Sequence, residues 1–373
     1  MTEGSGARKI KAATTPDSSP FGSRMTRSAV RQVLERTASD MQMNTPVVVV
    51  APRPAGGAPP ERQFPVTAPA EWRLSDSPLH LPGPAEMLKG AHAVITTVFT
   101  PEMGRASDSL MAILLPAAGY ENIARDAVPP GCVVANAYEH EAPIAEWVVM
   151  AMVALDHEVL KADRTFRAGS WEMWPARHGS FRELQGQTLG VVGLGRIGIR
   201  VAQVAKFLGM RCVAATRTVP AKLPAYLDKI VGMDRLHEAL AESDFVLVGT
   251  PLRAETRGLI GEREIAAMKR SAYLINPARG PIVDEKALYE ALRDARLGGA
   301  AIDTWWSYPQ GKDDSPRPSA YPFWELENVL MTPHQSGATN GTAMRRGRVV
   351  AANIDRLYRG EPLVNVVREV SRG

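Results

Sequence analysis

Three side chains that could take part in ionic or acid–base chemistry each follow a short apolar run in the second half of the chain. Arg279 stands just after one run, Asp303 ends another, and His334 follows a third. Buried runs of this kind are typical of parallel strands, whose carboxyl ends meet at one edge of a sheet. We therefore expect the three side chains to lie close together.

A guanidinium and an imidazole at such an edge indicate a definite chemistry. The planar fork of donors on Arg279 fits a carboxylate and a neighbouring carbonyl oxygen, and His334 can exchange a proton near neutral pH. Together they would orient a 2-oxo acid and relay the proton for hydride transfer to its carbonyl. Taken singly, Arg279 could be a surface charge, His334 a structural hydrogen-bond partner and Asp303 a capping carboxylate. The pattern as a whole favours a site, in which Asp303 contacts the cofactor.

The cofactor that this chemistry needs would bind at a glycine-rich turn earlier in the chain. An apolar run enters the sequence Gly193-Leu-Gly195-Arg196-Ile197-Gly198, and a helical pattern follows. In a dinucleotide-binding turn, the first glycine permits the turn, the second lets backbone N–H groups approach a pyrophosphate, and the third allows close helix packing. The helix N-terminus, with Arg196 and Ile197, is expected to bind the phosphates.

The next strand ends without the carboxylate that selects NAD. In dinucleotide-binding folds, an acidic residue about 20 positions after the glycine turn binds the ribose 2′-OH. Here the strand ends at Thr216 and Arg217. A hydroxyl can hydrogen-bond a 2′-phosphate and a guanidinium can pair with it. The sequence therefore predicts NADP as the preferred cofactor and NAD as a second option, with a solvated Arg217 and no preference as the alternative.

Composition and charge exclude several other classes of protein. The chain has 373 residues, 45% hydrophobic and 23% charged, which fits a globular protein of two domains. Its net charge is +4, and residues 1–44 carry +3 of it, so the rest has no basic stripe for nucleic acid. No apolar run is long enough to span a membrane. The two cysteines lie in apolar runs, and we expect a cytoplasmic protein without a metal site.

The order of elements predicts an α/β protein with two Rossmann-like, doubly wound parallel sheets and a cleft between them. Residues 1–44 are expected to be a disordered extension. Residues 45–154 with 335–373 are predicted to form a substrate domain, and 155–334 the dinucleotide-binding domain. Residues 53–84, rich in Pro and Gly, are expected to loop over the surface. Strands are expected at 47–50, 93–98, 110–115 and 132–135, and at 188–192, 212–215, 245–249, 272–276, 299–302 and 329–331.

Several motifs in order resemble one known family. They are the glycine turn, Thr250-Pro251-Leu252, Asn276-Pro277-Ala278-Arg279-Gly280, Asp303 and Thr332-Pro333-His334. Together they are similar to those of the D-isomer-specific 2-hydroxyacid dehydrogenases, and the resemblance spans residues 46–367. It implies an NAD(P)-dependent oxidoreductase that moves a hydride between a nicotinamide and C2 of a small 2-oxo or 2-hydroxy acid, similar to a glyoxylate or hydroxypyruvate reductase.

The resemblance also implies roles for individual residues. Arg279 would bind the substrate carboxylate and carbonyl, His334 would be the acid–base group, and Asp303 would hold the nicotinamide amide. The backbone turn at Gly119 would help to bind the substrate carboxylate. Members are commonly homodimers, with the segment 142–174 at the interface. Further cofactor contacts are expected at Thr250, Pro251, Pro277, Ala278, His334 and Gly337.

One position departs from the family pattern. The family places Glu, or Gln in formate dehydrogenases, where this chain has Tyr308. A carboxylate beside His334 would raise the pKa of the imidazole, whereas a phenol can only hydrogen-bond and orient the ring. We therefore expect a catalytic role for Tyr308, a less readily protonated His334 and slower ketone reduction at neutral pH. His140, as a substrate-binding residue, and Glu141 either reach the site and replace the missing acid or are surface loop residues.

Two other functions are compatible with this pattern. Oxidation of an anion such as formate needs no proton transfer and so tolerates Tyr308. A dinucleotide-sensing protein would keep the fold and bind the cofactor without turnover.

Overall fold

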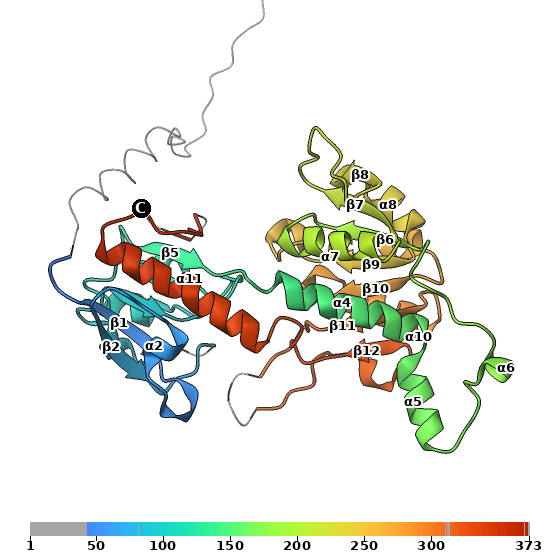
Figure 1. The fold of residues 1–373 in the computed structure, drawn as a ribbon, viewed down its shortest axis with the longest axis horizontal. Coiled ribbons are helices and arrows are strands. Elements are labelled where there is room, and N and C mark those ends of the chain that lie inside the picture. The colour runs from blue at the N-terminus through green and yellow to red at the C-terminus, as the bar shows by residue number, and fades with distance from the viewer. Residues whose placement is uncertain (1–42, 81, 310, 312–313, 369, 372–373) are drawn as a thin grey trace, which may run out of the picture.

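Figure 1 shows the fold of the computed structural model, which describes residues 43–371 except 81, 310, 312, 313 and 369. The extension predicted at residues 1–44 lies outside the described residues, apart from its last two positions. Two separate parallel sheets make up the framework, as the α/β pattern predicts. Each sheet carries helices on both faces, so the polar strand ends are the part of each sheet that is left to bind a ligand.

The first sheet has five parallel strands in the order β2-β1-β3-β4-β5. Strand β1 is almost wholly buried because its run of valines faces covered layers on both sides. Strand β2 corrects the prediction that residues 53–84 form only loops, because it pairs with β1 along six residues. It is an edge strand with polar side chains, so it has no apolar run to reveal it. The strands are β1 (Val47–Pro52), β2 (Ala70–Ser75), β3 (Ala93–Ile95), β4 (Ala112–Leu115) and β5 (Val133–Asn136).

The second sheet has seven parallel strands in the order β12-β11-β10-β9-β6-β7-β8. The direction of winding reverses between β6 and β9, which is the position where doubly wound sheets bind ligands. Strand β8 is a further edge strand that the sequence did not predict. The strands are β6 (Thr188–Val192), β7 (Arg211–Thr216), β8 (Lys229–Gly232), β9 (Phe245–Val248), β10 (Tyr273–Asn276), β11 (Gly299–Ile302) and β12 (Val329–Met331).

Helices cover both faces of each sheet. On the second sheet, α4 and α7 share one buried apolar cluster with the strands, and α8, α9 and α10 share the other. Among the described helices, none has the length and apolar character that a bilayer span requires. The helices are α2 (Pro60–Gln63), α3 (Pro101–Ala106), α4 (Glu141–Asp156), α5 (Val159–Arg167), α6 (Pro175–His178), α7 (Arg196–Phe207), α8 (Leu236–Glu242), α9 (Glu262–Ala267), α10 (Glu285–Arg293) and α11 (Asn340–Tyr358). Short 3-10 turns occur at 55–57, 85–88, 125–127, 233–235, 254–256, 280–282 and 323–325.

Two helices connect the sheets. Helix α4 follows β5 of the first sheet, yet its buried face packs in the core of the second sheet, against α7. The boundary predicted at residue 154 leaves most of this helix in the first domain along the chain, while its buried face packs on the second sheet. Helix α11 follows β12 of the second sheet and returns to the first, where Val350, Ile354 and Leu357 enter the core beside β1 and β4 (Figure 1).

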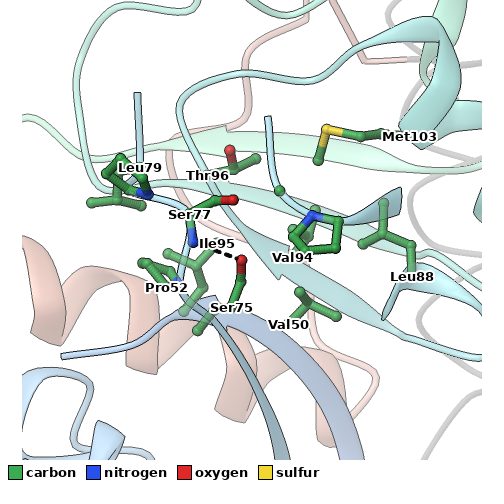
Figure 2. Close-up of a pocket in the computed structure, with 14 residues that line it drawn as sticks. Val50, Pro52, Ser75, Ser77, Leu79, Leu88, Val94, Ile95, Thr96 and Met103 are labelled. Carbon is green, nitrogen blue, oxygen red and sulfur yellow. Dashed lines mark hydrogen bonds between the residues drawn. The ribbon is translucent and has the colours of Figure 1, made fainter. Parts of the chain in front are cut away.

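Two cavities are described in the first domain, and neither belongs to the predicted site. Figure 2 shows one between the ends of β1, β2 and β3, lined by Ser75, Leu79 and Met103 among others. Its volume of about 20 Å³ holds little more than one water molecule. A wider surface hollow lies between α3 and the turn at 125–127. None of the residues predicted to bind substrate or cofactor lines either of them.

Candidate active site

The glycine turn between β6 and α7 has the geometry of a phosphate cradle. Gly193 has φ of +95°, and a Cβ on it would lie 2.7 Å from the backbone nitrogen of Thr250. A Cβ on Gly198 would lie 2.6 Å from the carbonyl oxygen of Gly193. Gly195 caps α7 and is open, with no atom closer than 3.9 Å to a Cβ placed there. The two crowded glycines thus fix the turn, and the open one leaves room for a pyrophosphate at the helix N-terminus.

The remaining predicted cofactor residues lie along the same edge of the second sheet. Thr250 and Pro251 follow β9, and Thr250 adjoins Gly193. Thr216 ends β7 half-buried, and Arg217 is exposed directly after it. Arg196 begins α7, and its Nε donates to Glu141 at the start of α4 at 2.5 Å. Ile197 packs against the core that α7 shares with α4.

The turn after β10 presents Arg279 to the first domain. The Asn276 side chain shapes it, since Oδ1 accepts from the Ala278 N–H at 3.1 Å and Nδ2 donates to the Arg279 carbonyl at 3.0 Å. Arg279 Nε then donates to Glu121 Oε1 at 3.1 Å. A Cβ on Gly119 would lie 2.3 Å from Arg279 Nη2, so the guanidinium lies directly against this turn. Pro277 and Ala278 are buried beneath it.

Asp303 holds the loop that carries His334. The aspartate is fully buried after β11. Its Oδ1 accepts from the Thr332 hydroxyl at 2.5 Å and from the Gln335 N–H at 2.9 Å, and Oδ2 accepts from the Ser336 N–H at 3.0 Å. His334 lies between these anchors with φ of +57°. This unusual backbone conformation is stabilised by the three hydrogen bonds, so Asp303 positions the loop in the structure as described.

The His334 ring faces Tyr308, at 5.6 Å between ring centroids. Surrounding protein atoms lower the pKa of this imidazole below its ordinary value, and the positive charge of Arg279 lowers it further. The residue still exposes surface at the junction of the domains. Tyr308 accepts a hydrogen bond from the Trp305 N–H at 3.0 Å, and burial raises the pKa of its phenol. Trp305 is itself buried in the aromatic core with Trp306.

His140 comes close to the loop of His334 from the first domain. A Cβ on Gly337 would lie 3.4 Å from His140 Cβ, so the loop and the start of α4 are in contact. Burial and the charge of Arg346 lower the pKa of His140 to about 4. Its neighbour Glu141 pairs with Arg196 instead, and no described contact links it to His334. The described ion pair of Glu141 is thus with Arg196 of α7.

Sequence reasoning missed three residues of this region. Glu121 pairs with Arg279, Asn276 shapes the arginine turn, and Arg346 of α11 donates to the Tyr138 carbonyl beside His140. Asn276 stood in a recognised motif and could have been singled out. Glu121 and Arg346 carry no local signal, because contacts between segments far apart in the sequence bring them to the site.

The comparisons with known proteins agree with this geometry. Residues 149–336, half of the chain, match the family described as D-isomer specific 2-hydroxyacid dehydrogenase, NAD binding domain. The chain belongs to this family. It is thus an NAD(P)-dependent oxidoreductase of 2-hydroxy acids, and a nicotinamide dinucleotide is its cofactor. The cradle at Gly195 fits the phosphates of such a group.

The relatives of this dehydrogenase are named for different activities. It is 34% identical over 300 residues to a glyoxylate reductase of Korarchaeum cryptofilum, covering 76% of this chain and 85% of that protein. It is 32% identical to a D-3-phosphoglycerate dehydrogenase of Methanocaldococcus jannaschii, covering 76% of this chain and 52% of that one. Among solved structures, the TT0316 protein of Thermus thermophilus matches with a TM-score of 0.70 and 31% identity, over 86% of this chain and 99% of the other.

Proposed function

We propose that this dehydrogenase reduces small 2-oxo acids such as glyoxylate or hydroxypyruvate, with Arg279 binding the substrate and His334 carrying the proton. The observation that supports this most is the approach of Arg279 to Gly119 of the first domain, together with the effect of its charge on the pKa of His334. The nicotinamide supplies the hydride. Arg279 holds the carboxylate and the carbonyl oxygen, so that C2 is presented in a fixed orientation. His334 donates a proton to that oxygen in reduction and removes it in oxidation.

The proton transfer depends on the groups that surround His334. With its pKa lowered by burial and Arg279, the free imidazole is neutral at pH 7. A neutral imidazole suits the removal of a proton from a hydroxy acid, whereas reduction first requires protonation. Tyr308 orients the ring but adds no negative charge. The anionic substrate itself would raise the pKa when it binds beside the ring.

The test is a steady-state comparison of glyoxylate and hydroxypyruvate reduction with formate oxidation. We expect turnover of the 2-oxo acids, and a loss of about a thousandfold in His334→Gln, which keeps the size of the ring but cannot relay the proton. Oxidation of formate without reduction of any 2-oxo acid would overturn the proposal in favour of anion oxidation. Tight cofactor binding with no turnover of either would instead favour a dinucleotide sensor.

We propose that NADP is the preferred cofactor. Arg217 is exposed at the end of β7, and Thr216 offers a hydroxyl next to it. Neither residue carries the negative charge that would repel a 2′-phosphate. The ratio of kcat/KM for NADPH over NADH should fall by about tenfold in Arg217→Ala, and remain the same in the exposed control Arg200→Ala. An unchanged ratio in the first variant would show that Arg217 does not select the cofactor.

We also propose that two chains associate through the segment 142–174. Phe166, Trp171 and Trp174 expose more than half of their surface, and Trp171 packs in a T-shaped arrangement with each of the other two. Exposed apolar groups of this size are typical of interfaces between protein chains. Analytical ultracentrifugation should give a dimer, and Phe166→Glu with Trp171→Glu should give monomers.

Two further proposals concern the domain limits and the location of the protein. We propose domain limits of 45–154 with 335–373 and of 155–334, with α4 as the connection that crosses them. We propose a cytoplasmic location, because Cys132 and Cys212 are free and buried thiols, as is usual in a reducing compartment. Limited proteolysis and the redox state of the thiols in cell extracts test the two assignments.

A further inference from the structure

Two neighbouring arginines at the start of α11 hold the backbone segment that precedes α4. Arg346 Nε donates to the Tyr138 carbonyl at 2.7 Å, and Arg345 Nη2 donates to the Glu139 carbonyl at 2.9 Å. Both carbonyls stand just before His140. Helix α11 therefore brings its second arginine to the same side of the first domain that meets the loop of His334.

The charges around this point are not balanced. Arg279 pairs with Glu121 at 3.1 Å, Arg196 with Glu141 at 2.5 Å, and Arg345 with Glu139 at 3.8 Å. Within the described part of the chain, Arg346 has no carboxylate oxygen within ion-pair distance, and the Tyr138 carbonyl is the acceptor that its side chain contacts. Burial lowers the pKa of this guanidinium to about 10. The charges of Glu141 and Glu139 oppose this shift, but each carboxylate already pairs with another arginine. A partly buried cation that lacks an ion pair of its own is costly, so an anionic partner would stabilise it.

An anionic group on a bound substrate would be such a partner. The charge of Arg346 lowers the pKa of both His140 and His334, and that of Arg279 lowers the pKa of Arg346. These couplings follow from the contacts already described: Arg346 touches the segment before His140, and His140 touches the loop of His334. The charges of both guanidiniums thus lower the pKa of both imidazoles. A substrate with one carboxylate can neutralise only the first.

We propose that Arg346 forms a second anion-binding site beside Arg279 and His334, and that it binds a second carboxylate or a phosphate on the 2-oxo acid. This inference rests on the proposed function and specifies its substrate class: a 2-oxo acid with an anionic group at the end remote from the reacting carbonyl. Glyoxylate, with one charge, would then be a poor substrate that leaves Arg346 uncompensated. A second anion would form charge-assisted hydrogen bonds with the terminal nitrogens of the guanidinium.

The test compares one-charge and two-charge acids in wild type, Arg346→Met and the control Arg348→Met, whose arginine is exposed on the same helix. Glyoxylate represents one charge; 2-oxoglutarate and 3-phosphohydroxypyruvate carry the second as carboxylate or phosphate, and so separate these two groups. In wild type, kcat/KM for either 2-oxoglutarate or 3-phosphohydroxypyruvate should exceed that for glyoxylate by at least about tenfold. In Arg346→Met, the KM for this preferred two-charge acid should rise about tenfold, while the KM for glyoxylate changes less than about twofold. Arg348→Met should match wild type.

A structural role alone gives a different result. If Arg346 serves only to hold the segment 138–140, Arg346→Met lowers kcat for all acids by one common factor and the preference is unchanged, which overturns the proposal. Calorimetric titration of the NADPH-bound protein with malonate and acetate gives a readout independent of turnover. Malonate should bind more weakly to Arg346→Met by about tenfold, and acetate equally. If no 2-oxo acid is reduced but malonate shows this difference, the second site stands and the proposed function fails; equal malonate binding overturns the second site.

Discussion

The cofactor turn and the junction around Arg279 are built in opposite ways. The turn occupies six consecutive residues, and its shape follows from steric contacts of Gly193 and Gly198 within one strand–helix unit. The junction draws side chains from both sheets, and ion pairs and hydrogen bonds at Glu121, Arg279 and Asp303 determine its shape. The first is therefore local and rigid, whereas the second depends on how two domains meet.

This difference shows where chemical specificity resides in the molecule. Steric constraints leave the turn little freedom, so it serves the phosphates common to all dinucleotides. The charges at the junction can be altered one at a time without changing either sheet. Changes of substrate within this fold are thus expected at the junction, and changes of stability at the turn and at the buried anchors.

The largest effect on activity is expected from Arg279→Met at the junction. Removing the guanidinium takes away the group that orients the acid, and kcat/KM should fall by about a thousandfold. The melting temperature should stay close to that of wild type, because Arg279 is partly exposed and its ion pair contributes little to stability. Arg293→Met, which removes a surface ion pair with Asp294, serves as the control. Retained turnover would mean that another residue binds the substrate carboxylate.

Asp303→Ala should affect stability rather than turnover alone. The substitution leaves two backbone N–H groups and the Thr332 hydroxyl without their acceptor, and the free energy of unfolding should fall by about 3 kcal/mol. Denaturant unfolding of this variant and of the surface variant Asp294→Ala measures the difference. A loss no larger than that of the control would contradict the anchoring role that the hydrogen bonds indicate.

Two glycines of the cofactor turn should separate folding from binding. In Gly198→Ala, the Cβ meets the Gly193 carbonyl, so the protein should lose about 1–3 kcal/mol of stability. In Gly195→Ala, the Cβ enters open space, so stability should be kept and the Kd for NADPH should rise. Thermal unfolding and fluorescence titration with NADPH distinguish the two. Equal effects of both variants on stability would argue against this division of roles.

The smallest effect is expected from Tyr308→Glu, as a shift in pH dependence. Because reduction needs the protonated form of His334, its rate falls as pH rises through the pKa of the imidazole. A carboxylate beside the ring should raise this pKa by about one unit, moving the falling limb of kcat/KM to higher pH. Tyr308→Phe, which adds no charge, should leave the limb in place. If both variants behave alike, the identity of the residue at 308 does not control the protonation of His334.

The sequence predicted most of the central strands, because each is a continuous apolar run between covered layers. It missed β2, where polar residues such as Glu71 and Arg73 interrupt any apolar run, and β8, which has only two consecutive apolar residues. In the site, Gly193, Arg279 and His334 stood in local motifs. Glu121 and Arg346 did not, because their place follows from contacts between segments more than a hundred residues apart, and no spacing along the chain encodes that contact.

The return of α11 to the first sheet also bears on how the protein is made. Val350 and Ile354 complete one face of a core that begins with Val47. On the ribosome, the first sheet is synthesised long before the helix that covers it, while the second sheet and its own helices emerge in between. We expect the nascent N-terminal sheet to stay loosely packed and protease-sensitive until the last helix is released, so that the domain begun first is the one finished last.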